Sequence, residues 1–265
     1  MMTYLGMFDL WFTDLAPATR VAAFARLGIT HLQLGSWRNQ PWPELSTVCA
    51  ETGTKLIATC DHRMGSLTDP LDNDQVIQAC QESLETLVTH GLKYLYLFAD
   101  QLTVRDGKEI ARPLTVPLPA EQQRRNLLQQ TEAILKLVEQ TEVTLLVQPQ
   151  NRFDSKNPLI HNVQSAAKWI QHFHHPQLRL AFDCYQQQRD SGNLLWNLVA
   201  HDGLYPVVNV ADVPTRQEPG TGEINFPNLY TTLAELGFNG YIGLNFKPSS
   251  SEVEALTRTH NLFSK

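Results

Sequence analysis

The chain alternates between short apolar runs, rich in β-branched and aromatic residues, and longer stretches in which apolar residues recur at helical spacing. The clearest helical stretches cover residues 72–90 and 120–140. Glycines close several helical stretches just before the next apolar run, as left-handed C-caps do: Gly28, Gly91 and Gly237. The apolar runs predict eight strands, over residues 4–8, 31–34, 55–59, 93–99, 144–148, 178–183, 206–210 and 241–245.

This alternation predicts an α/β fold in which each strand is followed by a helix. Eight such units of roughly 30 residues are typical of a (β/α)8 TIM barrel, here a single domain over residues 1–265. An open doubly wound sheet is the alternative, but no GxGxxG follows the first strand and no interdomain linker is visible. The long loop over residues 100–119 would lie on the carboxyl rim of the barrel, where long loops serve as lids.

The composition indicates the cellular compartment and the classes of binding partner that we expect for this chain. The formal net charge of −6 and the pI near 5.8 argue against a nucleic-acid groove or an anionic membrane surface. The four cysteines are scattered without a CxxC pair, which is typical of thiols in a reducing compartment. The N-terminal stretch lacks the basic region of a signal peptide, and no apolar run approaches the roughly 20 residues that span a bilayer. We therefore expect a cytoplasmic protein without nucleic-acid or membrane partners, for which a homo-oligomer is possible.

The chemistry of a TIM barrel lies at the carboxyl ends of its strands. The last four predicted strands end in Gln148, Asp183, Asn209 and Asn245. Oxygen-bearing side chains that converge on one point are the layout of an oxygen-ligated cation site. Only Asp183 carries a charge, however, so these residues are a poor set of ligands.

The loop after the seventh predicted strand carries a recognisable motif. The stretch VADVPTRQEPGTGEINFPNLYTTLAELGFNGYIGLNFKP, over residues 210–248, resembles the C-terminal signature of the hydroxypyruvate isomerase family, part of the xylose-isomerase-like barrels. LRLAFDCYQ over 178–186 and FTDLAP over 12–17 extend a weaker similarity over most of the chain. The resemblance implies a barrel fold and an aldose–ketose type of isomerase chemistry.

Carried over residue by residue, the resemblance exposes several departures. The family holds a divalent metal with Glu, Asp, Gln and Glu at the four strand ends, and its two glutamates also act as the acid/base pair. This chain has amides, Gln148 and Asn245, at both glutamate positions, and Asn209 at the glutamine position. Family histidines are replaced by Gln186, Gln217 and Val207, and a family glutamate by Gln33. The retained residues are Asp183, Arg216, Glu218, Glu223 and the glycine-rich turn.

These departures have chemical consequences for metal binding and for catalysis. Removing two carboxylates from beside a dication removes several kcal/mol of attraction each, and about 1.4 kcal/mol corresponds to a tenfold change in affinity. We expect no cofactor, with weak divalent metal binding possible at Asp183. Proton transfer through an enediol needs groups that titrate near neutrality, which Gln148 and Asn245 cannot do.

Two functional hypotheses follow. In the first, the chain is a non-catalytic relative that binds a small polar metabolite or a protein partner, with the ligand contacted by Arg216, Glu218, Gln186, Gln148 and Asn245. In the second, it is an active sugar or keto-acid isomerase or epimerase whose weakened or relocated site lies around Asp183, Glu218, Asp61 and His62. An apurinic endonuclease on the same barrel is disfavoured by the acidic charge and the missing metal cluster.

Structural interpretations compete with each functional one. Gln148 and Asn245 could satisfy each other's hydrogen bonds in a buried mouth, and Arg216 could form a rim salt bridge with Glu218. Aromatic residues after the first two strands would either stack on a sugar or pack in the core: Trp11, Phe12 and Trp37. The histidines of QHFHHP, residues 171–176, precede the sixth strand, where a helix C-terminus favours them and chemistry does not occur.

Overall fold

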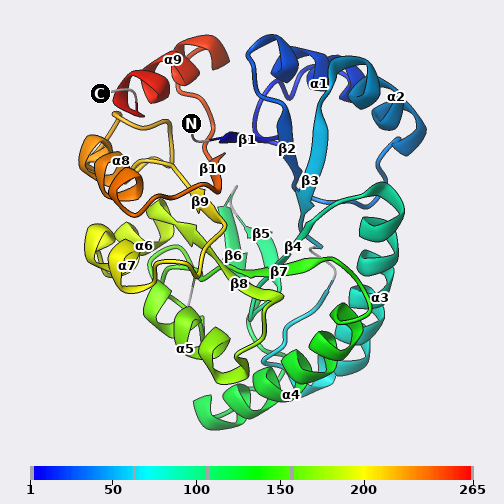
Figure 1. Ribbon diagram of the computed structural model, residues 1–265. Helices are drawn as coiled ribbons and strands as arrows, with labels where there is room; N and C mark the ends of the chain where they lie inside the picture. Colours follow the sequence, from blue (N-terminus) through cyan, green and yellow to red (C-terminus); the bar gives the residue numbers. More distant parts are fainter. Residues whose placement is uncertain (1–2, 62–63, 106–107, 156–157, 264–265) are drawn as a thin grey trace.

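The computed structural model describes residues 1–265 except 1–2, 62–63, 106–107, 156–157 and 264–265. Eight parallel strands form a closed barrel in the order β1-β10-β9-β8-β7-β4-β3-β2 (Figure 1). The fold is therefore the single-domain (β/α)8 TIM barrel that the alternating pattern predicts. The barrel strands are β1 Thr3–Met7, β2 His31–Leu34, β3 Lys55–Thr59, β4 Tyr94–Leu97, β7 Thr144–Val147, β8 Leu178–Asp183, β9 Val207–Asn209 and β10 Tyr241–Leu244.

Helices surround the barrel and cover its outer face (Figure 1). The predicted helices over 72–90 and 120–140 are confirmed as α3 and α4 to within two residues. Gly91 ends α3 in the left-handed conformation, with φ of 70°, as its position before a strand predicts. The helices are α1 Pro17–Arg26, α2 Trp42–Thr52, α3 Asn73–His90, α4 Ala120–Val138, α5 Val163–Phe173, α6 Cys184–Asp190, α7 Leu194–Ala200, α8 Phe226–Glu235 and α9 Glu252–Phe263, with a 3-10 turn η1 Pro70–Asp72 before α3.

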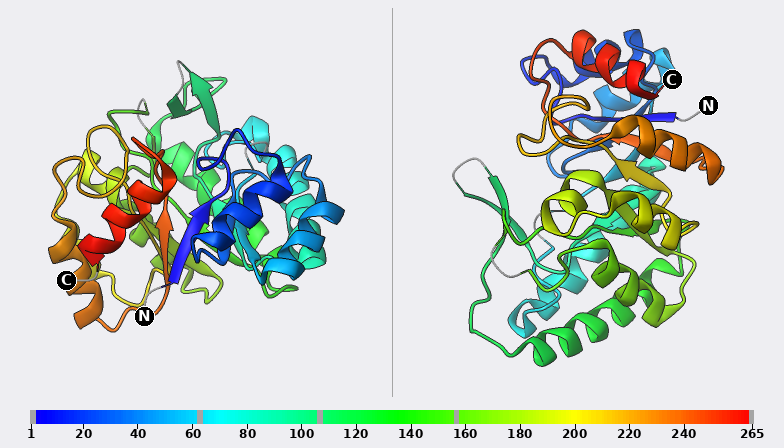
Figure 2. Two further views of the ribbon diagram at one scale, coloured as in Figure 1. Left: turned by 90° about the horizontal axis from the view of Figure 1, so that it is seen from above. Right: turned by 90° about the vertical axis from the view of Figure 1, so that its left-hand side faces the viewer.

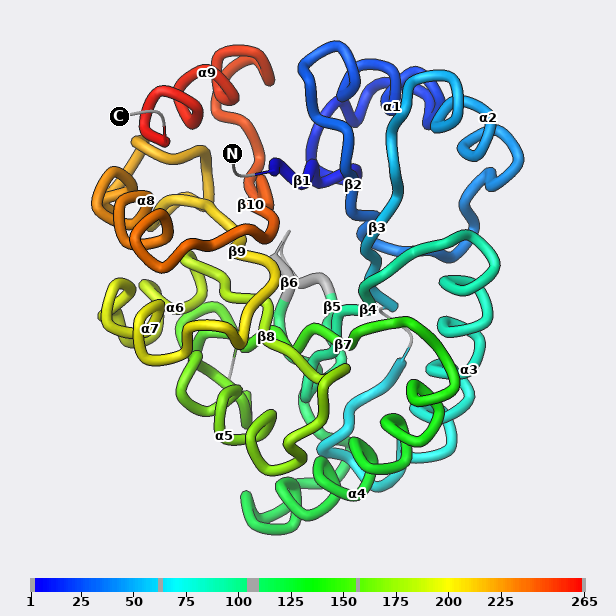
Figure 3. Tube along the Cα trace, viewed as in Figure 1, coloured from blue at the N-terminus to red at the C-terminus, as the bar shows by residue number. Residues whose placement is uncertain are grey.

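Apolar side chains pack in two layers. The larger cluster joins the outer faces of the strands to the apolar sides of the helices, as for Leu135 of α4 and Ile170 of α5. A separate cluster, drawn almost wholly from strands and including Leu5, Tyr96 and Val207, fills the barrel interior. Closure is completed where β10 returns beside β1, next to the start of the chain (Figure 3). In the part of the chain that is described, no helix has the length and apolarity to span a membrane.

The long loop after β4 contains a pair of strands. It holds an antiparallel hairpin of β5 Leu102–Arg105 and β6 Lys108–Ala111, which projects from the carboxyl face of the barrel (Figure 2). Its base is tied down by Ala111 N–H, which donates to Ser155 Oγ at 3.0 Å, and by Arg112, which pairs with Asp72. The segment therefore lies at the carboxyl rim, as expected for this loop, and it includes two paired strands that the sequence analysis did not predict.

Candidate functional site

The side chains at the ends of β7 to β10 form one hydrogen-bonded network in the barrel mouth. Gln148 Nε2 donates to Asp183 Oδ2 at 3.3 Å, and Asn245 Nδ2 donates to the same oxygen at 3.0 Å. Asn209 Nδ2 donates to Gln148 Oε1 at 3.2 Å. All four residues are buried. The structure thus brings together the four strand-end positions. The side-chain amides of Gln148 and Asn245 donate hydrogen bonds to Asp183 rather than to each other.

Asp183 is the charged member of this network and is 1% exposed. Burial raises the pKa of its carboxyl, whereas Arg216 and hydrogen bonds from Gln186 N–H and Asn245 oppose that rise. The Gln186 amide donates to Oδ1 at 2.9 Å, so Asp183 also caps the start of α6. Both carboxylate oxygens therefore already accept hydrogen bonds from neutral protein groups.

A glycine in β10 makes room for the network. A β-carbon placed on Gly243 would lie 2.0 Å from Asn209 Oδ1, closer than any side chain tolerates. Asn209 is fully buried, and its Oδ1 has no hydrogen-bond partner among the described residues. The sequence analysis missed Gly243, although a glycine inside a strand commonly marks a close approach of this kind.

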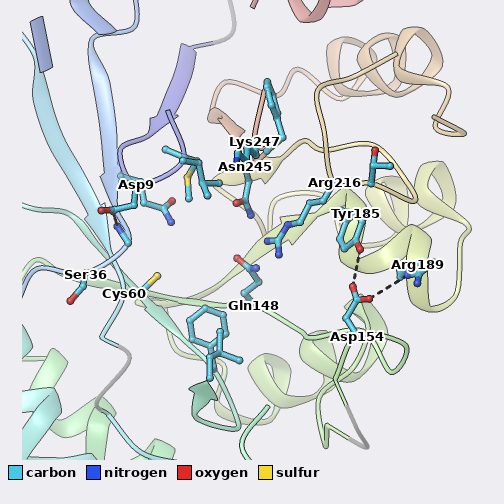
Figure 4. Close-up of a pocket in the computed structure, with 18 of the residues that line it drawn as sticks. Asp9, Ser36, Cys60, Gln148, Asp154, Tyr185, Arg189, Arg216, Asn245 and Lys247 are labelled. Atoms are coloured by element: carbon cyan, nitrogen blue, oxygen red, sulfur yellow. Dashed lines mark hydrogen bonds and ion pairs between the residues drawn. The ribbon is translucent and has the colours of Figure 1, made fainter. Parts of the chain in front are cut away.

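A cavity of about 680 Å³ opens above this network, at the carboxyl ends of the strands (Figure 4). Gln33, Gln148 and Asn245 contribute amides to its wall. Its volume falls in the range of small-molecule sites, and its lining mixes apolar and polar groups as such sites do. The apolar wall is made by Met7, Leu10, Phe98, Leu102, Pro214 and Phe246.

Arg216 extends into the cavity toward Gln148 (Figure 4). Its backbone is left-handed, with φ of 58°, and its N–H donates to the Asp212 carbonyl at 2.9 Å. The guanidinium lies over the Tyr185 ring, 5.3 Å from its centroid, and the buried Nε has no hydrogen-bond partner in the described residues. Arg216 is thus held over the mouth by an aromatic platform.

Tyr185 and Arg189, on α6, are fixed in turn by Asp154 (Figure 4). The Tyr185 hydroxyl donates to Asp154 Oδ2 at 2.8 Å, and Arg189 Nε lies 3.6 Å from Oδ1 of the same carboxylate. Burial, followed by the contact with Asp154, raises the pKa of Tyr185 to about 12. The phenol is therefore protonated at neutral pH and acts as a donor.

Two of the expected ligand contacts lie outside the cavity wall. Gln186 is buried, and its Oε1 accepts from Asn151 N–H at 2.8 Å and from Asn151 Nδ2 at 2.6 Å. Glu218 is 0% exposed and accepts from Ser249 N–H at 2.9 Å, from Ser249 Oγ at 2.6 Å and from Arg258 at 3.0 Å. Glu218 therefore joins α9 to the loop after β9, and it pairs with Arg258 rather than with Arg216.

Asp61, a carboxylate expected in a relocated site, is also hydrogen-bonded within the protein. Asp61, after β3, accepts two hydrogen bonds from Arg38, from Nε at 3.0 Å and from Nη2 at 2.7 Å. Ser83 Oγ of α3 donates to it at 3.0 Å. His62 lies outside the described residues. Asp61 is thus the buried half of an ion pair between the loops after β2 and β3.

The aromatic residues after β1 and β2 pack in the protein and do not line the cavity. Trp11 is 0% exposed, and its Nε1 donates to the Phe246 carbonyl at 3.0 Å. The Phe12 ring packs edge-on against Phe24, and Trp37 Nε1 donates to Ser83 Oγ at 2.9 Å. The packing interpretation of these residues therefore holds.

The histidine tract lies at the C-terminus of α5, away from the mouth. His174 caps that helix in the left-handed conformation, and His175 Nε2 lies 3.2 Å from Glu139. Within the described residues, no group of three or more His, Cys, Asp and Glu side chains is placed to hold a metal ion.

The closed parallel barrel makes the chain a TIM-barrel protein, and the cavity lies at the carboxyl ends of its strands. The model of the xylose isomerase-like TIM barrel family matches residues 21–262, so the chain belongs to that family.

Curated relatives match shorter segments. The chain is 28% identical over 132 residues to hydroxypyruvate isomerase of Escherichia coli (strain K12), covering 50% of this chain and 51% of that protein. It is 37% identical over 94 residues to a putative hydroxypyruvate isomerase of Xenopus laevis, covering 35% and 34%. It is 29% identical over 106 residues to 2-oxo-tetronate isomerase of Cupriavidus necator, covering 40% and 41%. The matches thus span about half or less of these relatives.

Solved structures share the barrel over its whole length. A family 2 AP endonuclease from Brucella melitensis superposes with a TM-score of 0.87 at 16% identity, covering 98% of this chain and 99% of that one. A 3-keto-D-glucoside 4-epimerase from E. coli superposes with a TM-score of 0.82 at 17% identity, with the same coverage. At such identities these likenesses show the fold alone.

Proposed function

We propose that the barrel mouth binds a small polar metabolite without isomerising it. The observation that carries this proposal is the pair of hydrogen bonds that Asp183 Oδ2 accepts from Gln148 and Asn245. These amides stand where the resemblance implies the acid and the base of an isomerase. Since a primary amide does not titrate near neutrality, neither can remove or return a substrate proton.

The same residues do not fit a divalent metal. A dication favours several carboxylate oxygens, and this set offers the carboxylate of Asp183 alone. Both of its oxygens accept N–H donors, and binding a cation there would require Gln148 and Asn245 to turn those donors away. The proposal therefore assigns no step to a metal ion.

The cavity supports binding of a metabolite. Its volume of about 680 Å³ and its mixed lining suit a compact ligand with several polar groups. Arg216, Gln148 and Asn245 are the contacts proposed for that ligand. Binding of a protein partner, self-association and a cytoplasmic location remain predictions from the sequence.

An active isomerase or epimerase with a weakened site is the second candidate. Burial raises the pKa of Asp183, which moves a carboxyl toward the range in which it exchanges protons at neutral pH. Against this candidate, Asp61 is paired with Arg38 and Glu218 with Arg258. Among the described residues of that relocated site, Asp183 alone is then left to supply the chemistry.

Proton exchange separates these two candidates. Purified protein is incubated with hydroxypyruvate in heavy water, with and without Mn²⁺, and deuterium incorporation next to the carbonyl is followed by NMR. We expect no incorporation above the protein-free rate, and the same result for Asp183→Asn. Incorporation by the wild type that is lost in Asp183→Asn would overturn the proposal and favour the active enzyme.

A further inference from the structure

Basic side chains gather on one side of the cavity. Arg189 on α6, Arg216 after β9 and Lys247 after β10 all line it. Figure 4 shows Arg189 and Arg216 across the cavity from Asp9 and Ser36, with Lys247 between the two sides, next to Asn245. They come from consecutive βα loops, which a barrel places side by side around its mouth. The wall between β8 and β10 is therefore cationic, although the chain as a whole carries a formal charge of −6.

The acidic residues of the cavity balance only part of this charge. Asp154 is held by Tyr185 and Asn151 and lies 3.6 Å from Arg189, so it offsets that guanidinium. Asp9, after β1, lies across the cavity from Arg189 and Arg216, and its carboxylate accepts a hydrogen bond from Gly35 N–H.

Arg216 and Lys247 are the two basic residues of the cavity whose charges these acidic residues do not offset. Within the described residues neither forms an ion pair. The charge of Arg216 opposes the rise in the pKa of Asp183, but the oxygens of that carboxylate accept amide and backbone donors. Arg216 is half-buried on the Tyr185 ring, deep in the cavity, whereas Lys247 is exposed at its rim.

We infer that the mouth recognises a small organic dianion, with one anionic group on Arg216 and the second on Lys247. The inference rests on the proposed function, because it names the chemical class of the metabolite. A planar guanidinium binds a carboxylate through two parallel N–H donors, whereas a lysine ammonium acts as a point charge on a phosphate or a second carboxylate. A phosphorylated hydroxy acid and a dicarboxylate share this chemistry.

Titration calorimetry at fixed ionic strength tests the inference with three probes: glycerate, 3-phosphoglycerate and malate. We expect at least one of the two dianions to bind about tenfold or more tightly than glycerate, because each charge-assisted contact contributes about that factor. Lys247→Gln should abolish this advantage and leave glycerate binding within about twofold. Arg216→Asn should weaken all three probes about tenfold or more, and asparagine tolerates the left-handed backbone at this position.

Lys168→Gln, an exposed charge change on α5, is the matched control and should keep the wild-type preference. The near-ultraviolet circular dichroism of each variant shows whether its fold is intact. Dianions that bind no tighter than glycerate, or an advantage that survives in Lys247→Gln, would overturn the inference, as would failure of both dianions to bind the wild type. These results leave the proposed function to be judged separately, by the proton-exchange experiment.

Discussion

Asp183 and Asp61 are both buried carboxylates at the carboxyl ends of barrel strands, yet they are stabilised by different neighbours. Around Asp183 the donors are neutral: the side-chain amides of Gln148 and Asn245 and the backbone of α6. Around Asp61 the main donor is a cation, since Arg38 makes two hydrogen bonds to it. In the half of the mouth formed by β7 to β10, the buried carboxylate is therefore held by amides, and we call it the amide-held half. In the half formed by β2 and β3 it is held by an ion pair, and we call it the ion-paired half.

This difference determines which cations are left for a ligand. In the ion-paired half, Arg38 is committed to Asp61 and to Glu82. In the amide-held half, neutral donors satisfy the carboxylate, and Arg216 stays available above it. The amides at the strand ends thus satisfy Asp183 and leave Arg216 in the cavity without an ion-pair partner among the described residues.

Restoring carboxylates to the amide-held half should have the largest effect. In Gln148→Glu/Asn209→Gln/Asn245→Glu the site takes on the ligand types that the resemblance implies, and Mn²⁺ affinity should rise about a thousandfold or more, because each added carboxylate contributes several kcal/mol beside a dication. Calorimetric titration with Mn²⁺ measures the change. The pair Gln122→Glu/Gln129→Glu, exposed on α4, adds the same charge elsewhere and should not alter Mn²⁺ binding. Equal affinities in both variants would refute the interpretation of the strand ends as a former metal site.

Breaking the ion pair between Arg38 and Asp61 should lower the free energy of unfolding. In Arg38→Leu the buried Asp61 carboxylate loses its guanidinium, and we expect the free energy of unfolding to fall by about 3–5 kcal/mol. Urea denaturation at pH 7 measures this loss. Glu82→Gln, which removes the exposed partner of the same arginine, should change stability far less. A small effect of Arg38→Leu would show that the pair is not what holds these loops together.

The smallest effect is expected at Glu218, a carboxylate paired with a cation outside the cavity. Burial raises the pKa of Glu218, but hydrogen bonds from Ser249 and the charge of Arg258 outweigh it, so its pKa lies below the ordinary 4.5. A depressed pKa means that the ionised group stabilises the fold at neutral pH, and this stability is lost as pH falls below about 4.5. Glu218→Gln should therefore lower the free energy of unfolding by about 1–3 kcal/mol at pH 7.

The difference between the wild type and Glu218→Gln should shrink as the pH is lowered, in urea denaturation curves measured from pH 7 to pH 3. Binding of 3-phosphoglycerate at pH 7 should be unchanged, because Glu218 lies behind the cavity wall. Weaker binding with unaltered stability would return Glu218 to the ligand site, where the sequence analysis had placed it.

The fold was largely predictable from local patterns. Three of the eight barrel strands, β2, β3 and β8, have the predicted bounds, and the others differ by one or two residues at an end. The hairpin after β4 was missed because its strands are four residues each, too short for a clear alternating pattern. The convergence of Asp183 with the strand-end amides followed from barrel topology, which brings successive strand ends together.

The barrel, the residues at its strand ends and the non-titrating amides at two of them could be read from the chain alone, because periodicity and residue type are local properties. Which donor meets which acceptor depends on how the chain folds. The partners Arg38 and Asp61 are separated by 23 positions, and Glu218 and Arg258 by 40. The space that Gly243 leaves for Asn209 likewise depends on the packing of β9 against β10. Such contacts are set by side-chain direction across neighbouring strands and loops, which no local pattern encodes.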